Sequence, residues 1–114
     1  IPEKGLLIYP GKLYLGATNE KVWTRDLIPN IDGRSSIGRC GISIHVTAGK
    51  GDPGFQGTFT LEIWTVQPAK LYPNMRLGQL IFEPMVIHPL ATGADDYQGR
   101  YQNQQSPVPT RYAQ

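Results

Sequence analysis

The stretch Thr58–Val66, which reads TFTLEIWTV, decides the fold class of this protein. It is rich in the β-branched and aromatic residues that favour strands, and its side chains alternate in character. Phe59, Leu61 and Ile63 fall on one face of the predicted strand, whereas Glu62 falls on the other. We therefore predict a long strand here, with one face in the core.

Shorter runs of the same kind lie on both sides of this strand, and turn residues separate them. The chain carries 13 glycines and 10 prolines, a content that favours many short strands over long helices. Two upstream runs, joined by the turn pair Pro10-Gly11, predict a hairpin. The further expected strands are Leu6–Tyr9, Lys12–Ala17, Ile42–Thr47 with Ile42, Ile44 and Val46 on its buried side, and Arg76–Phe82.

Two segments interrupt this pattern. Ile28–Gly33 contains Pro, Asn, Asp and Gly and is interpreted as a loop. Arg34–Arg39 is the one segment expected to form a short helical turn, because Gly33 and Gly41 mark its ends. The sequence thus predicts an all-β domain with one short helix.

Charge and cysteine content narrow the function classes. A net charge of +2 is too weak to indicate a nucleic acid polymer as partner. The single cysteine, Cys40, is interpreted as a small buried hydrophobe, and a cytoplasmic setting fits a chain without a disulfide framework. His45 and His88 lack the spacing of a zinc site, so no protein metal site is predicted. No apolar run is long enough to span a membrane.

Several residues have both a functional and an ordinary interpretation. Arg34-Ser35-Ser36 could hold a phosphate at the start of the helical turn, or Ser35 or Ser36 could simply cap it. Glu62 is unusual within a β-favouring run and could be a general base, or it could face solvent. Asp52 lies in the turn sequence GDPG, and Arg39 and Lys50 could be surface cations. The individual signals leave these alternatives open.

The order and spacing of six segments resemble the dCTP deaminase family of the dUTPase-like superfamily. These segments are Asp32–Arg39 (DGRSSIGR), His45–Ala48 (HVTA), Asp52–Gly57 (DPGFQG), Thr60–Ile63 (TLEI), Leu71–Phe82 (LYPNMRLGQLIF) and Tyr101–Gln105 (YQNQQ). The resemblance implies a single domain over residues 1–114 with a distorted β-barrel of the jelly-roll type. It also implies a homotrimer with active sites between subunits and a C-terminal lid over residues 97–114. Mg²⁺ would bind through the phosphates of dCTP, without zinc, unlike the zinc deaminases.

The resemblance also implies a role for each matching residue. Glu62 would be the general base that activates the water attacking C4 of cytosine. Arg39 would help to place that water, and Ser35 would lie near it. The residues expected to bind the nucleotide are Arg34, Ser36, Val46, Thr47, Ala48, Lys50, Asp52, Tyr97, Arg100 and Gln104.

The primary reading is hydrolytic deamination of dCTP to dUTP and ammonia, and four alternatives stay open. Gly49 stands where histidine is common, and glycine there is also seen in bifunctional members that continue to dUMP and pyrophosphate. A plain dUTPase is disfavoured because the tail Gln102–Arg111 contains no glycine. The family's N-terminal helix and strands are absent, which leaves room for a noncatalytic nucleotide-binding trimer. A carbohydrate- or protein-binding sandwich would explain the strands but not the ordered motifs.

Overall fold

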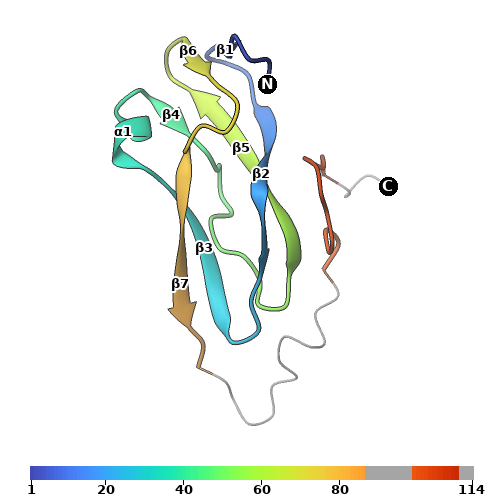
Figure 1. Ribbon diagram of the computed structural model, residues 1–114. Coiled ribbons are helices and arrows are strands. Elements are labelled where there is room, and N and C mark those ends of the chain that lie inside the picture. The colour runs from blue at the N-terminus through green and yellow to red at the C-terminus, as the bar shows by residue number, and fades with distance from the viewer. Residues whose placement is uncertain (87–98, 111–114) are drawn as a thin grey trace.

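The computed structural model describes residues 1–86 and 99–110, and nearly all of the regular structure there is β (Figure 1). The elements are β1 (Leu6–Ile8), β2 (Tyr14–Trp23), β3 (Leu27–Gly33), α1 (Ser35–Gly38), β4 (Ile42–Ser43), β5 (Gln56–Thr65), β6 (Ala69–Leu71) and β7 (Gly78–Pro84). The prediction of an all-β chain with one short helix is confirmed.

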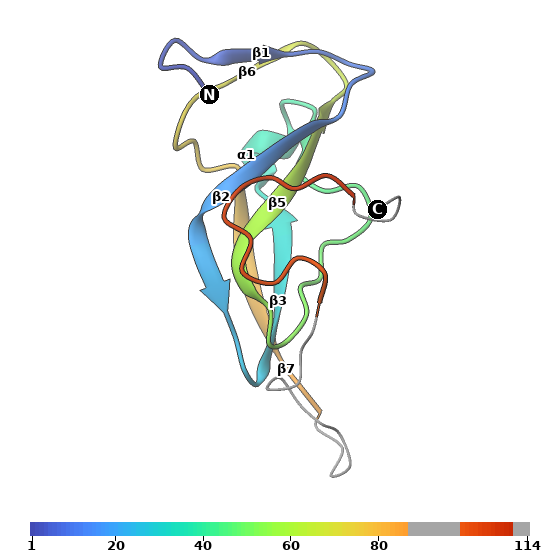
Figure 2. The same ribbon diagram turned by 90° about the vertical axis from the view of Figure 1, so that its right-hand side faces the viewer.

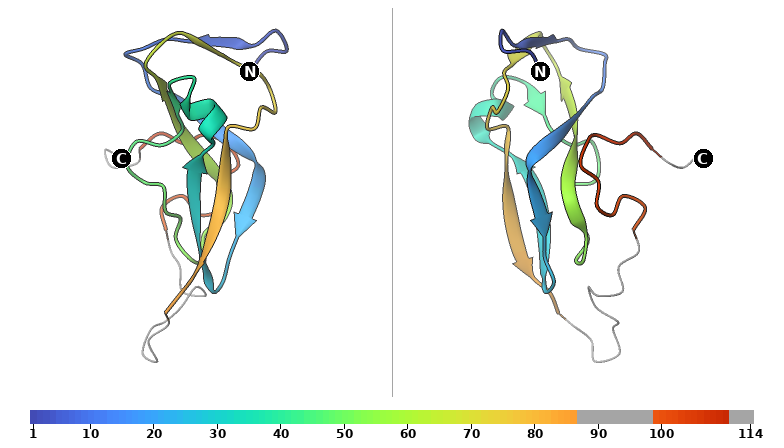
Figure 3. Two further views of the ribbon diagram at one scale, coloured as in Figure 1. Left: turned by 90° about the vertical axis from the view of Figure 1, so that its left-hand side faces the viewer. Right: turned by 45° about the vertical axis from the view of Figure 1, so that its right-hand side comes forward.

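The strands form three small antiparallel sheets. β5 is the middle strand of the order β2-β5-β4, while β1 pairs with β6 and β3 pairs with β7. Figure 2 views the molecule from the β5 side, with the β3–β7 pair behind, and the left panel of Figure 3 shows the reverse. Within residues 1–86 and 99–110 these sheets do not close into a barrel.

The core lies between these sheets. The predicted alternation of β5 is confirmed over residues 61–64, since Leu61 and Ile63 are buried and Trp64 is exposed. Ile8 and Leu71 are almost inaccessible and tie the β1–β6 pair to the same cluster. The buried members of the cluster are Ile8, Ile37, Ile42, Ile44, Leu61, Ile63 and Leu71.

The interpretation of Ile28–Gly33 as a loop is wrong, because these residues belong to β3. Backbone groups of Pro29 and Ile31 point away from β7: the Ile31 amide donates to Gly49 O at 2.6 Å, and Pro29 O accepts from the Gly51 amide at 2.6 Å. Since ladder bonds alternate along a strand, the N–H that Pro29 lacks is not needed by β7. Proline is therefore tolerated in the middle of this strand.

Two other expectations need correction. The first two strands do not form a hairpin, because β1 pairs with β6 and β2 pairs with β5. The strand expected over Ile42–Thr47 ends at Ser43: Ile42 and Ile44 are buried as predicted, but Val46 is 52% exposed. The chain leaves β5 after Ile44, whose carbonyl still accepts a bond from the Glu62 amide at 2.9 Å.

Residues 99–110 lie beside β5, on the edge that does not pair with β2 (Figures 1 and 2). They form no strand, but two backbone bonds join them to β5. The Asn103 amide donates to Gln56 O at 2.6 Å, and the Thr58 amide donates to Gln104 O at 2.9 Å. The two ends of the expected lid segment lie outside the described residues: residues 97–98, which include Tyr97, and residues 111–114.

Candidate active site

Glu62 lies on the outward face of β5 together with Thr60 and Trp64, an arrangement that we call the outer face. The alternation of the strand puts these side chains on the side opposite the buried Leu61 and Ile63. Glu62 is half-buried, and in residues 1–86 and 99–110 its carboxylate makes no hydrogen bond or ion pair. The carboxylate is therefore available to a reacting water.

Exposed apolar side chains share the outer face with this carboxylate. Leu15 is paired with Glu62 across the β2–β5 ladder and is 40% exposed. Leu13, Val46 and Trp64 line a shallow hollow of about 290 Å³, and Trp64 is two residues from Glu62 on the same face of the strand. Val46, one of the residues expected at the base edge of the nucleotide, is thus brought to the outer face.

The C-terminal segment reaches the same face through Gln104. The Gln104 Nε2 donates to Thr58 O at 2.7 Å and to Thr60 Oγ1 at 3.2 Å. The Val108 amide also donates to Thr60 Oγ1, at 3.3 Å. Because Thr60 and Glu62 are two residues apart on one face, Gln104 bonds to the outer face about 7 Å along the strand from the candidate base.

A second cluster of predicted site residues is built on α1. Arg34, Ser35, Ser36 and Arg39 are all exposed, and the helix begins after Arg34 without any side-chain cap. The ordinary interpretation of Ser35 or Ser36 as a helix cap is therefore wrong. The Arg34 Nη1 donates to Arg76 O at 3.2 Å, which anchors its guanidinium near β7. Two hydroxyls and two cations are left facing outward, as an anionic ligand would need.

Cys40, expected to be buried, is exposed. Its thiol follows α1 and donates to Ser36 O at 3.3 Å. The short helix leaves this position on the surface because Ile37 alone among its residues turns inward.

The structure does not bring the two clusters together within one chain. In Figure 1, β4 lies between α1 and β5. No salt bridge or hydrogen bond joins Arg39 to Glu62 in the part of the chain that the structure describes. The residues expected to share one site are therefore divided between two separate surfaces.

The remaining predicted residues lie on the loop that follows β4 and on the C-terminal segment. Thr47, Ala48 and Arg100 are exposed. Lys50 bridges to Asn30 of β3, and its Nζ lies 3.7 Å from Glu83 Oε2 of β7. Asp52 opens a turn in which its carbonyl accepts a bond from the Phe55 amide at 3.1 Å, as its turn sequence predicts.

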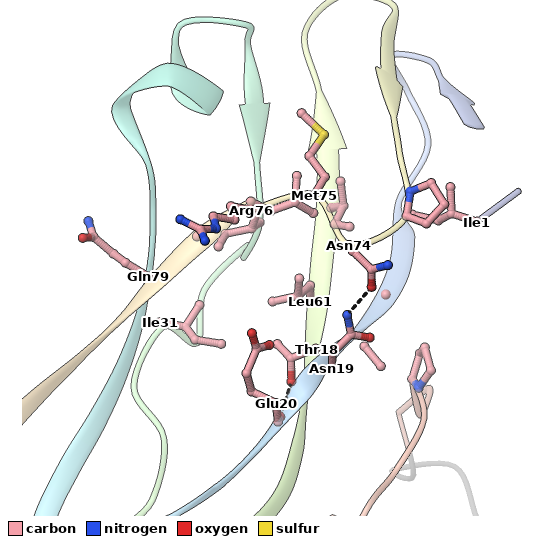
Figure 4. Close-up of a pocket in the computed structure, with 18 of the residues that line it drawn as sticks. Ile1, Thr18, Asn19, Glu20, Ile31, Leu61, Asn74, Met75, Arg76 and Gln79 are labelled. Atoms are coloured by element: carbon pink, nitrogen blue, oxygen red, sulfur yellow. Dashed lines mark hydrogen bonds between the residues drawn. The ribbon is translucent and has the colours of Figure 1, made fainter. Parts of the chain in front are cut away.

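A different feature is a cleft of about 770 Å³ between the β2–β5 and β3–β7 pairs (Figure 4). Ile31 and Leu61 point into it, and polar groups such as Glu20, Asn74 and Arg76 stand at its rim. Asn19 Nδ2 donates to Asn74 Oδ1 at 2.7 Å across one end. None of the predicted site residues that the structure describes lines this cleft, and the buried core residues Ile44, Leu61 and Ile63 form part of its wall.

Residues 1–86 and 99–110 contain neither a metal-type cluster nor a membrane-spanning helix. No group of three or more His, Cys, Asp or Glu side chains gathers there as a metal site would require. No helix in those ranges has the length and apolarity needed to cross a membrane.

Comparison with known proteins identifies the family. The family model described as "dCTP deaminase-like" matches residues 1–85, which contain the α1 cluster and the outer face of β5. The chain belongs to the dCTP deaminase-like family.

Three relatives give the likeness in detail. The chain is similar to proteins named "dCTP deaminase, dUMP-forming". It is 50% identical over 104 residues to one from Hathewaya histolytica, covering 90% of this chain and 58% of that protein. It is 53% identical over 104 residues to one from Clostridium botulinum strain Eklund 17B, covering 90% and 57%. It is 43% identical over 111 residues to one from Cytophaga hutchinsonii, covering 96% and 61%. The chain thus spans less than two thirds of the length of these relatives.

The alternation of the strand predicts Thr60 and Trp64 on the same face as Glu62, although it gives neither a role. The contacts of Gln102 and Gly57 could not be predicted from the sequence, because they depend on where the C-terminal segment docks.

Proposed function

We propose that the protein deaminates dCTP and hydrolyses the resulting dUTP to dUMP and pyrophosphate. The carrying observation is that the family match includes Glu62, and that Glu62 lies on an open face of β5, the face on which Gln104 bonds to Thr60. The relatives' names, all dUMP-forming, favour the bifunctional alternative over release of dUTP as the final product. A cytoplasmic setting remains part of this proposal.

In the deamination step, Glu62 accepts a proton from the water that attacks C4 of cytosine. It passes that proton to N3, then accepts the hydroxyl proton of the tetrahedral intermediate and gives it to N4, so that ammonia leaves as the C4–N4 bond breaks and the C4 carbonyl forms. Arg39 and Ser35 help to place that water. Val46, Thr47 and Ala48 offer backbone groups to the base edge, and Asp52 receives the sugar hydroxyl.

The positively charged side chains bind the triphosphate, which carries Mg²⁺ with it as part of the substrate. Guanidinium groups bind phosphate in a bidentate manner, which suits Arg34 and Arg100, while Lys50 acts as a point charge. Ser36 adds a hydroxyl, and Tyr97 and Gln104 belong to the segment that closes the site. A second water cleaves dUTP between the α- and β-phosphates to give dUMP and pyrophosphate.

The separation of the two clusters supports an active site shared between subunits. A carboxylate among exposed apolar side chains on one surface complements a patch of cations and hydroxyls on another. Contacts between unlike surfaces are heterologous and close into rings, as in a homotrimer. In such a trimer, α1 of one subunit faces Glu62 of the next, and the distorted barrel of the family would be completed in the assembled protein.

Product analysis tests the activity. The purified protein is incubated with dCTP and Mg²⁺, and the nucleotides are separated by chromatography. We expect dUMP and pyrophosphate to accumulate, whereas accumulation of dUTP alone would show a monofunctional deaminase. Glu62→Gln should retain the fold and dCTP binding but lose deamination, since the amide cannot take a proton from water. Substantial residual turnover in this variant would remove Glu62 from its role.

Mixing two inactive variants tests the shared site. Arg39→Ala retains Glu62, and Glu62→Gln retains Arg39, so a site between two different subunits can be intact. After co-refolding at equal amounts, random assembly into rings restores about a quarter of the sites. Co-refolded mixtures with no activity above either variant alone would argue for sites contained within single chains.

A further inference from the structure

Gly57 of β5 lies directly under the C-terminal segment. It is buried and has a φ of +149°, and a Cβ built there would stand 2.8 Å from Gln104 O and 3.0 Å from Gln104 N. No side chain fits at such distances, and these atoms are backbone that cannot swing aside. The bare Cα of Gly57 therefore lets the segment approach β5 closely enough for the adjacent Thr58 amide to reach Gln104 O at 2.9 Å.

Gln102 fastens the same segment one step earlier. Its side-chain amide bonds to the backbone as a neighbouring strand would. Oε1 accepts from the Gln56 amide at 2.7 Å, and Nε2 donates to Gly54 O at 2.9 Å. These bonds satisfy backbone polar groups of Gln56, the first residue of β5, and of Gly54 just before it. The amide thus spans the turn that contains Asp52 and the first residues of β5.

We propose that Gly57 and Gln102 are positioning residues of the active site, which hold the C-terminal segment on β5 so that Gln104 stands beside Glu62. They act through the segment rather than on the substrate. Gly57 supplies the space, and Gln102 fixes the register along the strand. The Nε2 of Gln104 can then reach Thr60 at 3.2 Å, two residues from the candidate base. For its effect on turnover the proposal rests on the function proposed above; for docking it does not.

Hydrogen exchange measures the docking directly. In the intact protein we expect slow exchange at the amides of Thr58 and Asn103, which bond across the junction. Gly57→Ala and Gln102→Leu should each speed exchange in peptides covering residues 56–60 and 101–105 by about tenfold or more, as expected when a local bonded unit opens more often.

Matched controls separate docking from general damage. Gly11→Ala carries a similar backbone cost, since Gly11 has a φ of +81°, but a Cβ there meets nothing within 4 Å. Gln67→Leu removes a glutamine side-chain amide that donates to Cys40 O at 3.2 Å, far from the junction, and leaves the backbone bonds of Gln67 with Thr65 Oγ1 in place. Neither control should change exchange at Thr58 or Asn103. Equal acceleration by Gly11→Ala would overturn the role of Gly57.

Kinetics with dCTP test positioning. If Gln104 contributes to nucleotide binding only when docked, Gln102→Leu should raise KM about tenfold with kcat changed less than twofold. A protein truncated after residue 98 lacks Gln102 and the docked segment. In that protein Gly57→Ala should cause no further rise in KM. A further rise there would show that Gly57 acts without the segment and would sink the proposal.

The outcomes are distinguishable. Unchanged exchange in both variants would refute docking through Gly57 and Gln102 whatever the activity. Faster exchange with an unchanged KM would refute their role in positioning the site. If the intact protein made no product from dCTP, the proposed function would fail while exchange still decided the docking.

Discussion

The position of α1 depends on one side chain, and Ile37→Ala tests this dependence. The helix has four residues and no side-chain cap, and helices this short have no stability of their own. Ile37 is its only buried residue, 6% exposed, and packs into the core cluster. Removing it therefore releases the segment that carries Arg34, Ser35, Ser36 and Arg39.

The magnitude follows from the burial. Replacing a buried isoleucine by alanine loses the transfer free energy of three carbon groups and leaves a cavity, about 3 kcal/mol in total. For a chain of 114 residues this corresponds to a fall in Tm of about 12 °C. Ile37→Val, which removes one carbon, should cost about 1 kcal/mol.

Urea unfolding and dCTP kinetics together form the assay. Ile37→Val should stay folded and raise KM for dCTP, because the phosphate-binding groups on α1 become less well ordered. Val66→Ala is the control: Val66 is 65% exposed and its truncation should change stability by less than about 0.5 kcal/mol. A loss below about 1 kcal/mol for Ile37→Ala would refute the claim that this side chain holds the helix.

The other predictions concern Lys50 and Gly78. Lys50→Gln should raise KM for dCTP. The free energy of unfolding should change by less than about 1 kcal/mol, because the Lys50–Glu83 ion pair is exposed. An unchanged KM would show that the Lys50 side chain contacts β7 but does not bind the nucleotide. Gly78→Ala should destabilise by about 2 kcal/mol in urea unfolding, since a Cβ there would lie 2.5 Å from Ile44 Cδ1, whereas Gly38→Ala meets nothing within 4 Å and should be nearly neutral. Equal stability of these two glycine variants would contradict the packing described here.

The β character of the chain could be predicted because the alternation of apolar and polar residues along a strand involves only residues close together in the sequence. The alternation around Leu61 and Ile63 gave the correct buried face of β5. Pro29 misled the prediction, because the sequence does not show which edge of a strand needs its N–H groups. The partners of β1 and β2 were likewise set by contacts with β6 and β5, which are distant in sequence.

The candidate site was predictable in its residue types but not in its arrangement. The resemblance implied that Glu62 and the residues of α1 belong to one site; the family match covers these residues, and their roles stay a prediction. Whether they meet within a chain depends on tertiary packing, and here the structure separates them. The docking of Gln102 also escaped prediction, because its bonds reach residues 46 and 48 positions away.

The docked C-terminal segment has a consequence for association between molecules. An unpaired strand edge is a template on which another chain can add, and proteins protect such edges by covering them. Residues 102–104 cover the edge of β5 near Gly57, so a strand from another molecule cannot pair with β5 there. In the described residues the outer edges of β2 and β7 carry no such cover. Within the described residues, these two edges are therefore open places where another chain could add to a long strand.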